Sequence, residues 1–81
     1  MSKTIRSARH EAVRRLLVDE RKKAGLTQAA VAASLRRYQS FVATVESGQR
    51  RVDVVEFLAF AEAIGFDPQR ALRRIALTRG T

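Results

Sequence analysis

The sequence lacks several residue types on which small proteins often depend. It has no cysteine and no tryptophan, and only one proline and one histidine, among 81 residues. Disulfides and thiolate metal sites are therefore excluded, and the lone His10, expected near a frayed end, rules out most histidine metal sites and Ser-His or Cys-His catalytic pairs. With no glycine-rich phosphate loop and no nucleophile–base pair, we expect neither an enzyme nor a cofactor.

Long apolar runs and acidic residues are also scarce. No apolar run approaches the roughly 18–20 residues that span a bilayer, and the first six residues lack the apolar segment of a signal peptide. We therefore expect a soluble, cytoplasmic protein. Eight acidic residues face 16 basic ones, for a net charge of +8. This charge favours polyanionic partners: nucleic acid first, then an acidic membrane surface or an acidic protein.

The positive charge is unevenly distributed along the chain. Residues 1–40 contain 10 basic and 3 acidic side chains, whereas residues 41–81 contain 6 and 5. Partner binding should therefore lie in the first half, leaving the second half for packing or self-association. We predict a flexible basic arm at residues 1–7, one domain at 8–78 and a short tail at 79–81.

Apolar periodicity and helix-stop residues predict five helices. Strand-like alternation never persists, and glycines fall where helices should end. We expect an all-α, compact five-helix bundle. The predicted helices cover residues 8–24, about eight residues from Thr27, and residues 39–47, 53–64 and 68–78.

The segment 27–47 is the most informative for function, because it predicts two short helices joined by a tight turn. In the second of these, Val42 and Val45 should face inward, while short side chains face outward. Small polar residues let a helix backbone approach the base edges in the major groove, and a glutamine such as Gln39 can pair with adenine through two hydrogen bonds.

Four short motifs in this part of the chain occur together: LTQ at 26–28, QSFV at 39–42, ESGQRR at 46–51 and DVVEFL at 53–58. Together they resemble the Cro/phage-repressor type, or xenobiotic-response-element, helix-turn-helix family over about residues 11–72. The resemblance implies a DNA-binding transcriptional regulator. It further implies a homodimeric repressor on a palindromic double-stranded operator, associated with the nucleoid when bound.

The resemblance also implies roles for individual residues. The base-facing positions are Gln39, Ser40, Ala43 and Thr44. The resemblance also makes Gln28 and Arg50 contacts to the phosphate backbone, and the further phosphate-contacting candidates, chosen for their own charge or hydroxyl, are Thr27, Arg36, Arg37 and Arg51. Gln28 should also support the reading helix, and Arg21 and Glu46 match a structural ion pair between the first and third helices.

Two residues of the predicted turn depart from the family pattern. Arg36 stands where glycine is usual, and Arg37 where an apolar residue is usual. A positive φ at a non-glycine residue costs about 1 kcal/mol. The turn should therefore be strained or differently wound. The neighbouring Phe41 is expected to pack against the loop after residue 47, or alternatively to touch a thymine methyl or a sugar.

The last two predicted helices carry more large apolar residues than a small core requires. Some should pack internally, and the remainder should form an apolar patch for a two-fold dimer. The interface residues we expect are drawn from Phe57, Phe60, Phe66, Leu72, Ile75 and Leu77.

Other functions remain open at this point. Small proteins of this family include controller proteins of restriction–modification systems. They also include antitoxins, which neutralise a partner toxin and autoregulate their operon. A basic module for membranes or RNA is a further alternative, although the chain has few aromatic residues on which bases could stack.

Overall fold

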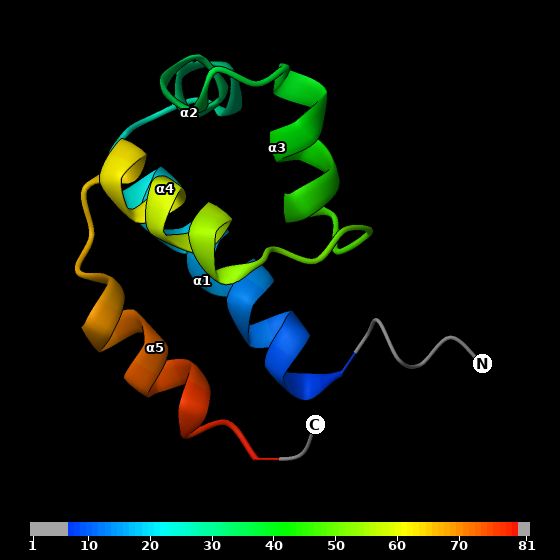
Figure 1. Ribbon diagram of the computed structural model, residues 1–81, viewed down its shortest axis with the longest axis vertical. Helices are drawn as coiled ribbons and strands as arrows, with labels where there is room; N and C mark the ends of the chain where they lie inside the picture. The colour runs from blue at the N-terminus through cyan, green and yellow to red at the C-terminus, as the bar shows by residue number, and fades with distance from the viewer. Residues whose placement is uncertain (1–6, 80–81) are drawn as a thin grey trace.

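The computed structural model describes residues 7–79, which form five α-helices and no strand. The helices are α1 (Ala8–Lys23), α2 (Gln28–Leu35), α3 (Gln39–Glu46), α4 (Val54–Ile64) and α5 (Pro68–Ala76) (Figure 1). The predicted all-α class is confirmed, and each predicted helix matches an observed one with ends that differ by one or two residues. Most of the predicted arm (residues 1–6) and tail (residues 80 and 81) lies outside the described residues.

Short polar side chains begin the helices where the sequence predicted. The hydroxyl of Thr27 accepts a hydrogen bond from the Ala30 amide at 3.0 Å and so caps α2. Asp53 caps α4, and the Asp53 amide in turn donates to Glu56 Oε1 at 3.0 Å. This reciprocal pair satisfies two amides that the helix itself cannot bond. Local chemistry therefore fixes where α2 and α4 start.

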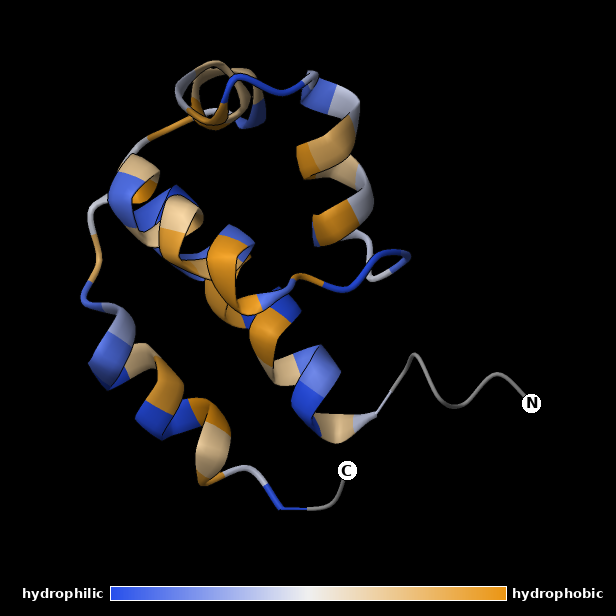
Figure 2. Ribbon diagram, in the orientation of Figure 1, coloured by the Kyte–Doolittle hydropathy of each residue, from blue (hydrophilic) through white to orange (hydrophobic). Residues whose placement is uncertain are grey.

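The hydrophobic core lies where α1, α2, α3 and α4 meet, and α5 closes it from the other side of α1. Apolar segments of α1, α3 and α4 point toward this junction, whereas the turn after α2 and the loop after α3 are hydrophilic (Figure 2). Because the core needs only one side of α3, the rest of that helix stays at the surface. The largest side chains with under 2% exposure are Phe60, Leu17, Val31, Val42 and Val45.

The core also takes up part of the predicted dimer interface. Phe57, Phe60 and Ile75 are buried in it, so they are unavailable for a second subunit, and Phe66 is half-buried with its ring edge-on to Phe57. Such a small chain needs these side chains internally, because little else can fill the space between α1, α4 and α5. The large apolar side chains left exposed on α4, on α5 and directly after α5 are Val54, Val55, Leu58, Leu72 and Leu77.

The turn between α2 and α3 keeps a left-handed residue even without glycine. Arg36 has φ 58° and ψ 43°, and it is the one non-glycine residue with positive φ in the described chain. The Arg37 amide donates to the Ala32 carbonyl at 3.0 Å across this turn. Of the two outcomes expected, the turn is therefore strained rather than differently wound, because its hydrogen bonds hold Arg36 in place.

Candidate nucleic-acid interface

Helix α3 lies at the edge of the molecule and is attached along one side only. It packs against α2 and α1, and Val42 and Val45 anchor it with 0% and 2% exposure (Figure 1). Its remaining surface is made of short side chains. Gln39 and Ser40 are exposed, while Ala43 and Thr44 are half-buried. The predicted base-facing residues are therefore all at least partly accessible on a helix of eight residues.

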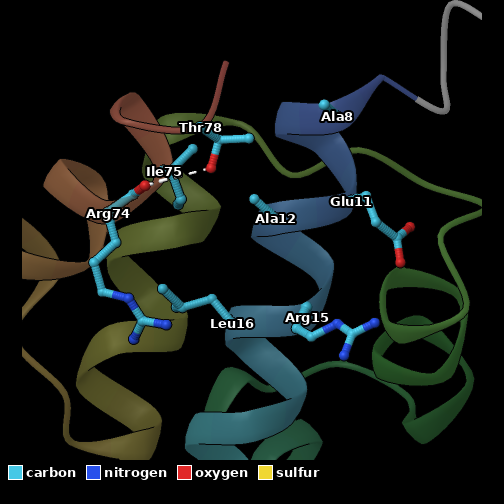
Figure 3. A pocket seen from close by; sticks show the side chains of 8 residues that line it. All are labelled: Ala8, Glu11, Ala12, Arg15, Leu16, Arg74, Ile75 and Thr78. Carbon is cyan, nitrogen blue, oxygen red and sulfur yellow. Dashed lines mark hydrogen bonds between the residues drawn. The ribbon is translucent and has the colours of Figure 1, made fainter. Parts of the chain in front are cut away.

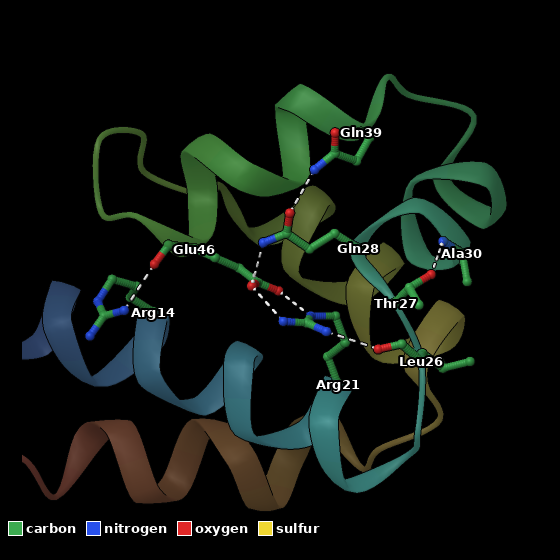
Figure 4. Close-up of polar contacts among 8 residues, drawn as sticks. All are labelled: Arg14, Arg21, Leu26, Thr27, Gln28, Ala30, Gln39 and Glu46. Atoms are coloured by element: carbon green, nitrogen blue, oxygen red, sulfur yellow. Dashed lines mark hydrogen bonds and ion pairs between the residues drawn. The ribbon is translucent and has the colours of Figure 1, made fainter.

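A continuous chain of polar contacts joins α1 to the first residue of α3 (Figure 4). Arg21 donates to both carboxylate oxygens of Glu46, through Nε at 2.6 Å and Nη2 at 2.9 Å. Gln28 Nε2 donates to Glu46 Oε1 at 2.9 Å. Gln39 Nε2 then donates to Gln28 Oε1 at 2.7 Å. The expected ion pair and two of the predicted DNA-contacting glutamines are thus part of one network.

The Arg21–Glu46 pair is largely removed from water. The two side chains are 13% and 9% exposed, and Arg21 also donates to the Leu26 carbonyl at 2.9 Å. The hydrogen bond to Glu46 raises the pKa of the Arg21 guanidinium above its ordinary value. A bidentate contact with this little solvent fixes the relative position of the two helices more firmly than a surface pair can.

Two further side chains of α1 hold the C-terminal end of α3. Arg14 donates to the Glu46 carbonyl at 2.8 Å, and His10 Nε2 donates to the Gly48 carbonyl at 3.0 Å. His10 is only 7% exposed, so the expectation that it lies near a frayed end was wrong. The sequence signal that could have placed it is Ser7, whose hydroxyl accepts from the His10 amide and starts α1 just before it.

A second polar cluster surrounds Phe41 and the start of α4. Arg50 donates to both oxygens of Glu56 at 3.0 Å, and Arg37 lies 3.8 Å from the same carboxylate. Both guanidinium groups lie over the Phe41 ring, at 3.8 Å for Arg37 and 4.8 Å for Arg50. The Phe41 ring also stacks on the Phe60 ring, with their centroids 6.1 Å apart. Packing of Phe41 against the loop after α3 is therefore observed, and Arg37 at the usually apolar position covers the ring.

The predicted phosphate contacts are divided between these two clusters and the open surface. Gln28 belongs to the polar network of Arg21 and Glu46, whereas Arg37 and Arg50 belong to the cluster around Phe41. Thr27, Arg36 and Arg51 are exposed. The Arg50–Glu56 contact was missed in the sequence, although the Asp-x-x-Glu spacing at 53–56 is that of a capping box and could have placed Glu56.

The far side of the molecule offers a shallow pocket between α1 and α5. Its floor is formed by Ala12, Leu16 and Ile75, with Arg15 and Arg74 beside it (Figure 3). No group of acidic or histidine residues that could hold a metal ion occurs in residues 7–79. None of the helices there is long and apolar enough to cross a membrane. We take the accessible polar face of α3 as the candidate site, because two buried valines and the polar network from α1 hold it in place.

Comparison with known proteins identifies the family of the chain. Residues 4–74 match the family described as "Helix-turn-helix domain". The chain belongs to the helix-turn-helix family. It is also similar to the solved structure of an XRE-family like protein from Pseudomonas syringae pv. tomato, with 45% identity, a TM-score of 0.81 and coverage of 85% of this chain and 84% of that one. This helix-turn-helix protein is thus a DNA-binding regulator of the XRE type and not an enzyme.

Two more solved structures are similar to this helix-turn-helix protein. The restriction-modification controller protein C.AhdI from Aeromonas hydrophila is 31% identical, with a TM-score of 0.70 and coverage of 76% of this chain and 94% of that one. The clp gene regulator ClgR from C. glutamicum is 22% identical, with a TM-score of 0.76 and coverage of 84% and 88%, and shares the fold. No curated protein is significantly similar to the chain.

Proposed function

We propose that the protein is a sequence-specific repressor that inserts α3 into the major groove of its operator. The observation that supports this reading is the accessible face of α3, where Gln39 and Ser40 are exposed above two buried valines. The major groove accommodates one helix, and short side chains let that helix approach the base edges. Gln39, Ser40, Ala43 and Thr44 then face the bases.

The surrounding polar groups bind the phosphate backbone on either side of α3. Thr27, Gln28 and Arg36 belong to α2 and its two caps, Arg37 and Arg50 lie over the Phe41 ring, and Arg51 follows Arg50 in the loop. Arg50 acts mainly by fixing the loop after α3, because Glu56 already holds two of its donors. Such contacts set the register of the protein on the duplex, while the base-facing residues supply specificity.

A selection of bound duplexes from a random pool, followed by anisotropy titrations, tests this function. The Gln39→Ala variant should lose about 1–3 kcal/mol of discrimination at one base pair. The matched control is Gln69→Ala, because Gln69 is an exposed glutamine on α5. Affinity should also fall steeply with salt, with a log–log slope of about 0.9 per phosphate contacted. A flat salt profile, or a Gln39→Ala variant that binds like the wild type, would exclude α3 as the reading helix.

The repressor acts as a homodimer whose subunits meet through exposed apolar residues of α4 and α5. Val54 and Val55 are 70% and 76% exposed, and Leu77 is 74% exposed. Large side chains this accessible favour a partner surface, and a two-fold dimer sets two reading helices about 34 Å apart on a palindrome. Sedimentation equilibrium of Val55→Lys against wild type tests this arrangement. A dimer unchanged by Val55→Lys would remove the α4 face from the interface.

A second candidate role is control of a restriction–modification operon. The 31% identity to the controller protein C.AhdI favours it, because that similarity covers three quarters of the present chain. In this case the selected duplex should match a sequence upstream of the protein's own reading frame. If the selected sequence occurs only at unrelated promoters, the controller role is wrong while the repressor assignment stands.

A further inference from the structure

A second cationic surface lies on the side of the molecule away from α3. Helix α5 packs against α1 and α4, and these two helices lie between α5 and α3 (Figure 1). The three arginines of α5, which are Arg70, Arg73 and Arg74, are all exposed. Within residues 7–79, none of their side chains forms a hydrogen bond or an ion pair. The proposed contacts to DNA leave this surface unused.

The electrostatics of α5 alone do not account for all three arginines. Arg73 and Arg74 lie in the last turn, where the helix dipole stabilises cations. Arg70 lies in the first turn, where the same dipole disfavours a positive charge, and the Asp67 carboxylate before it caps the helix by accepting from the Gln69 amide. Arg70 and Arg74 are also four residues apart, and like charges at this spacing destabilise a helix. An anionic partner would offset both costs.

Helices α1 and α5 run antiparallel and enclose a groove. Arg9 at the start of α1 donates to the Ala76 and Thr78 carbonyls at the end of α5. At the other end of the pair, Lys23 of α1 and Asp67 before α5 line the same hollow. The groove therefore follows the length of α1, whose 16 residues span about 24 Å.

The floor of the groove is apolar and its α5 edge is basic. Ala12, Leu16 and Ile75 form the floor of the pocket near the start of α1 (Figure 3). Arg74 lines this pocket and also the hollow at the other end, which Arg70 lines as well. The two hollows are therefore neighbours along one groove, with two arginines one helical turn apart on its edge.

The acidic residues of the groove do not cancel this charge. Glu11 and Glu20 line it, but each already forms an ion pair with a basic residue of α1. Arg15 also lines the groove, is exposed, and has no ion pair within the described part of the chain. Apart from the capping Asp67, the charges left without a partner along the groove are therefore positive.

We propose that this groove, here called the α1–α5 groove, binds an acidic amphipathic helix of a partner protein. A helix laid into a groove covers its floor with apolar side chains. Carboxylates four residues apart on that helix match the spacing of Arg70 and Arg74, and a guanidinium binds a carboxylate through two parallel hydrogen bonds. A DNA duplex would contact only the arginines at the edge and leave the apolar floor uncovered, so the floor favours a protein partner.

The test uses the full chain and a synthetic helical peptide of about 18 residues. One face of the peptide carries leucine and alanine, and glutamates four residues apart flank that face. Titration into the isotope-labelled protein at about 150 mM salt, followed through amide chemical shifts, reports affinity and location together. We expect saturable shifts in α1 and α5 with a dissociation constant below about 1 mM. A peptide with glutamine in place of glutamate, and one of scrambled order, should not saturate.

Charge reversal at the edge of the groove tests the named arginines. Arg70→Glu and Arg74→Glu should each weaken peptide binding by about fivefold or more, because each replaces an attraction with a repulsion. Arg36→Glu is the matched control, since it makes the same change in net charge at an exposed arginine between α2 and α3. It should change the peptide affinity by less than about twofold, because salt screens distant exposed charges. Thermal melting of each variant confirms that the fold is retained.

Several outcomes would overturn the proposed partner. Shifts confined to α2, α3 and the loop after α3, or no saturable binding, would remove the α1–α5 groove as a docking site. A duplex without operator sequence that shifts α1 and α5 as strongly as the peptide would make the groove a general polyanion surface. A change in sedimentation equilibrium in Arg74→Glu would assign the groove to self-association.

The inference is independent of the reading role proposed for α3, because the groove and α3 lie on different sides of the molecule. Selection of duplexes from a random pool measures the DNA-binding role separately. A protein that selects a sequence but does not bind the peptide keeps the proposed repressor function and loses the partner. A protein that binds the peptide in the α1–α5 groove but selects no sequence keeps the partner and loses the repressor function.

Discussion

Two glutamate–arginine contacts among residues 7–79 use both oxygens of the carboxylate and lie in different surroundings. In both, one guanidinium donates twice to one carboxylate: Arg21 to Glu46 in one region and Arg50 to Glu56 in the other. The side chains of the first pair are 13% and 9% exposed, whereas those of the second are 41% and 19% exposed. The two pairs therefore differ in solvent access, and also in the guanidinium nitrogens that they use, which are Nε and Nη2 in Arg21 and Nη1 and Nη2 in Arg50.

This difference separates two roles that a bidentate pair can have. A buried pair is costly to break, because the remaining charge is left in a region of low polarity. An exposed pair adds little to stability, because water and salt solvate the separated partners. The buried Arg21–Glu46 pair, here called the inner pair, therefore sets the position of α3 on α1; the more exposed Arg50–Glu56 pair is called the outer pair. The outer pair orders a loop that lies against Phe41 and can still exchange contacts at the surface.

The largest expected effect is the loss of stability in Glu46→Ala. This change leaves the Arg21 charge in its largely buried site and also removes the acceptor for Gln28. We expect the free energy of unfolding to fall by about 3–5 kcal/mol, measured by urea denaturation. Glu62→Ala is the control, because Glu62 is an exposed glutamate of α4 and should shift stability by less than about 0.5 kcal/mol. Near wild-type stability in Glu46→Ala would mean that the two pairs do not differ in role.

A smaller effect is expected at the outer pair. Glu56→Ala removes the Arg50 contact and the return bond to the Asp53 amide, so stability should fall by about 1 kcal/mol. In a double-mutant cycle with Arg50→Met, the coupling energy should be about 0.5 kcal/mol and should shrink in 1 M salt. A coupling as large as that between Arg21 and Glu46 would contradict the assignment of the outer pair to the solvated surface.

Much of this arrangement could be predicted from the sequence because local signals determine it. The caps at Thr27 and Asp53, the stop at Gly25 and the inward valines of α3 each depend on a few neighbouring residues. The five helices follow from such signals. The exposed face of α3, which we propose reads the DNA, follows as well, since two short helices with buried valines leave few ways to pack α3.

The contacts between distant segments could not be predicted in the same way. His10 reaches Gly48 across 38 residues, and Arg9 donates to the carbonyls of Ala76 and Thr78 at the end of α5. Such contacts depend on how α1 crosses the other helices, which charge and periodicity do not specify. For the same reason, the sequence does not specify which large apolar residues of α4 and α5 pack in the core and which lie at the surface. Whether Phe57 faces the core or a partner depends on the rotation of α4.

The smallest expected effect is a dependence on pH of the stability that the Arg50–Glu56 pair contributes. The hydrogen bonds from Arg50 and from the Asp53 amide lower the pKa of Glu56 below its ordinary value. The unfolded chain therefore takes up a proton at Glu56 before the folded protein does, so the stability from this group is complete above the ordinary glutamate value of about 4.3. It is lost as the pH falls through the lowered value. The difference in stability between wild type and Glu56→Gln should accordingly shrink below about pH 4.

Urea denaturation of both proteins at a series of pH values between about 3 and 7 measures this difference directly. The other carboxylates titrate in both proteins and largely cancel in the difference. A difference that stays constant over this range would mean that Arg50 and Glu56 do not interact in solution. The Arg50 donors that Glu56 now occupies would then be available to bind phosphate, and the loop after α3 would be ordered mainly by the contact between His10 and Gly48.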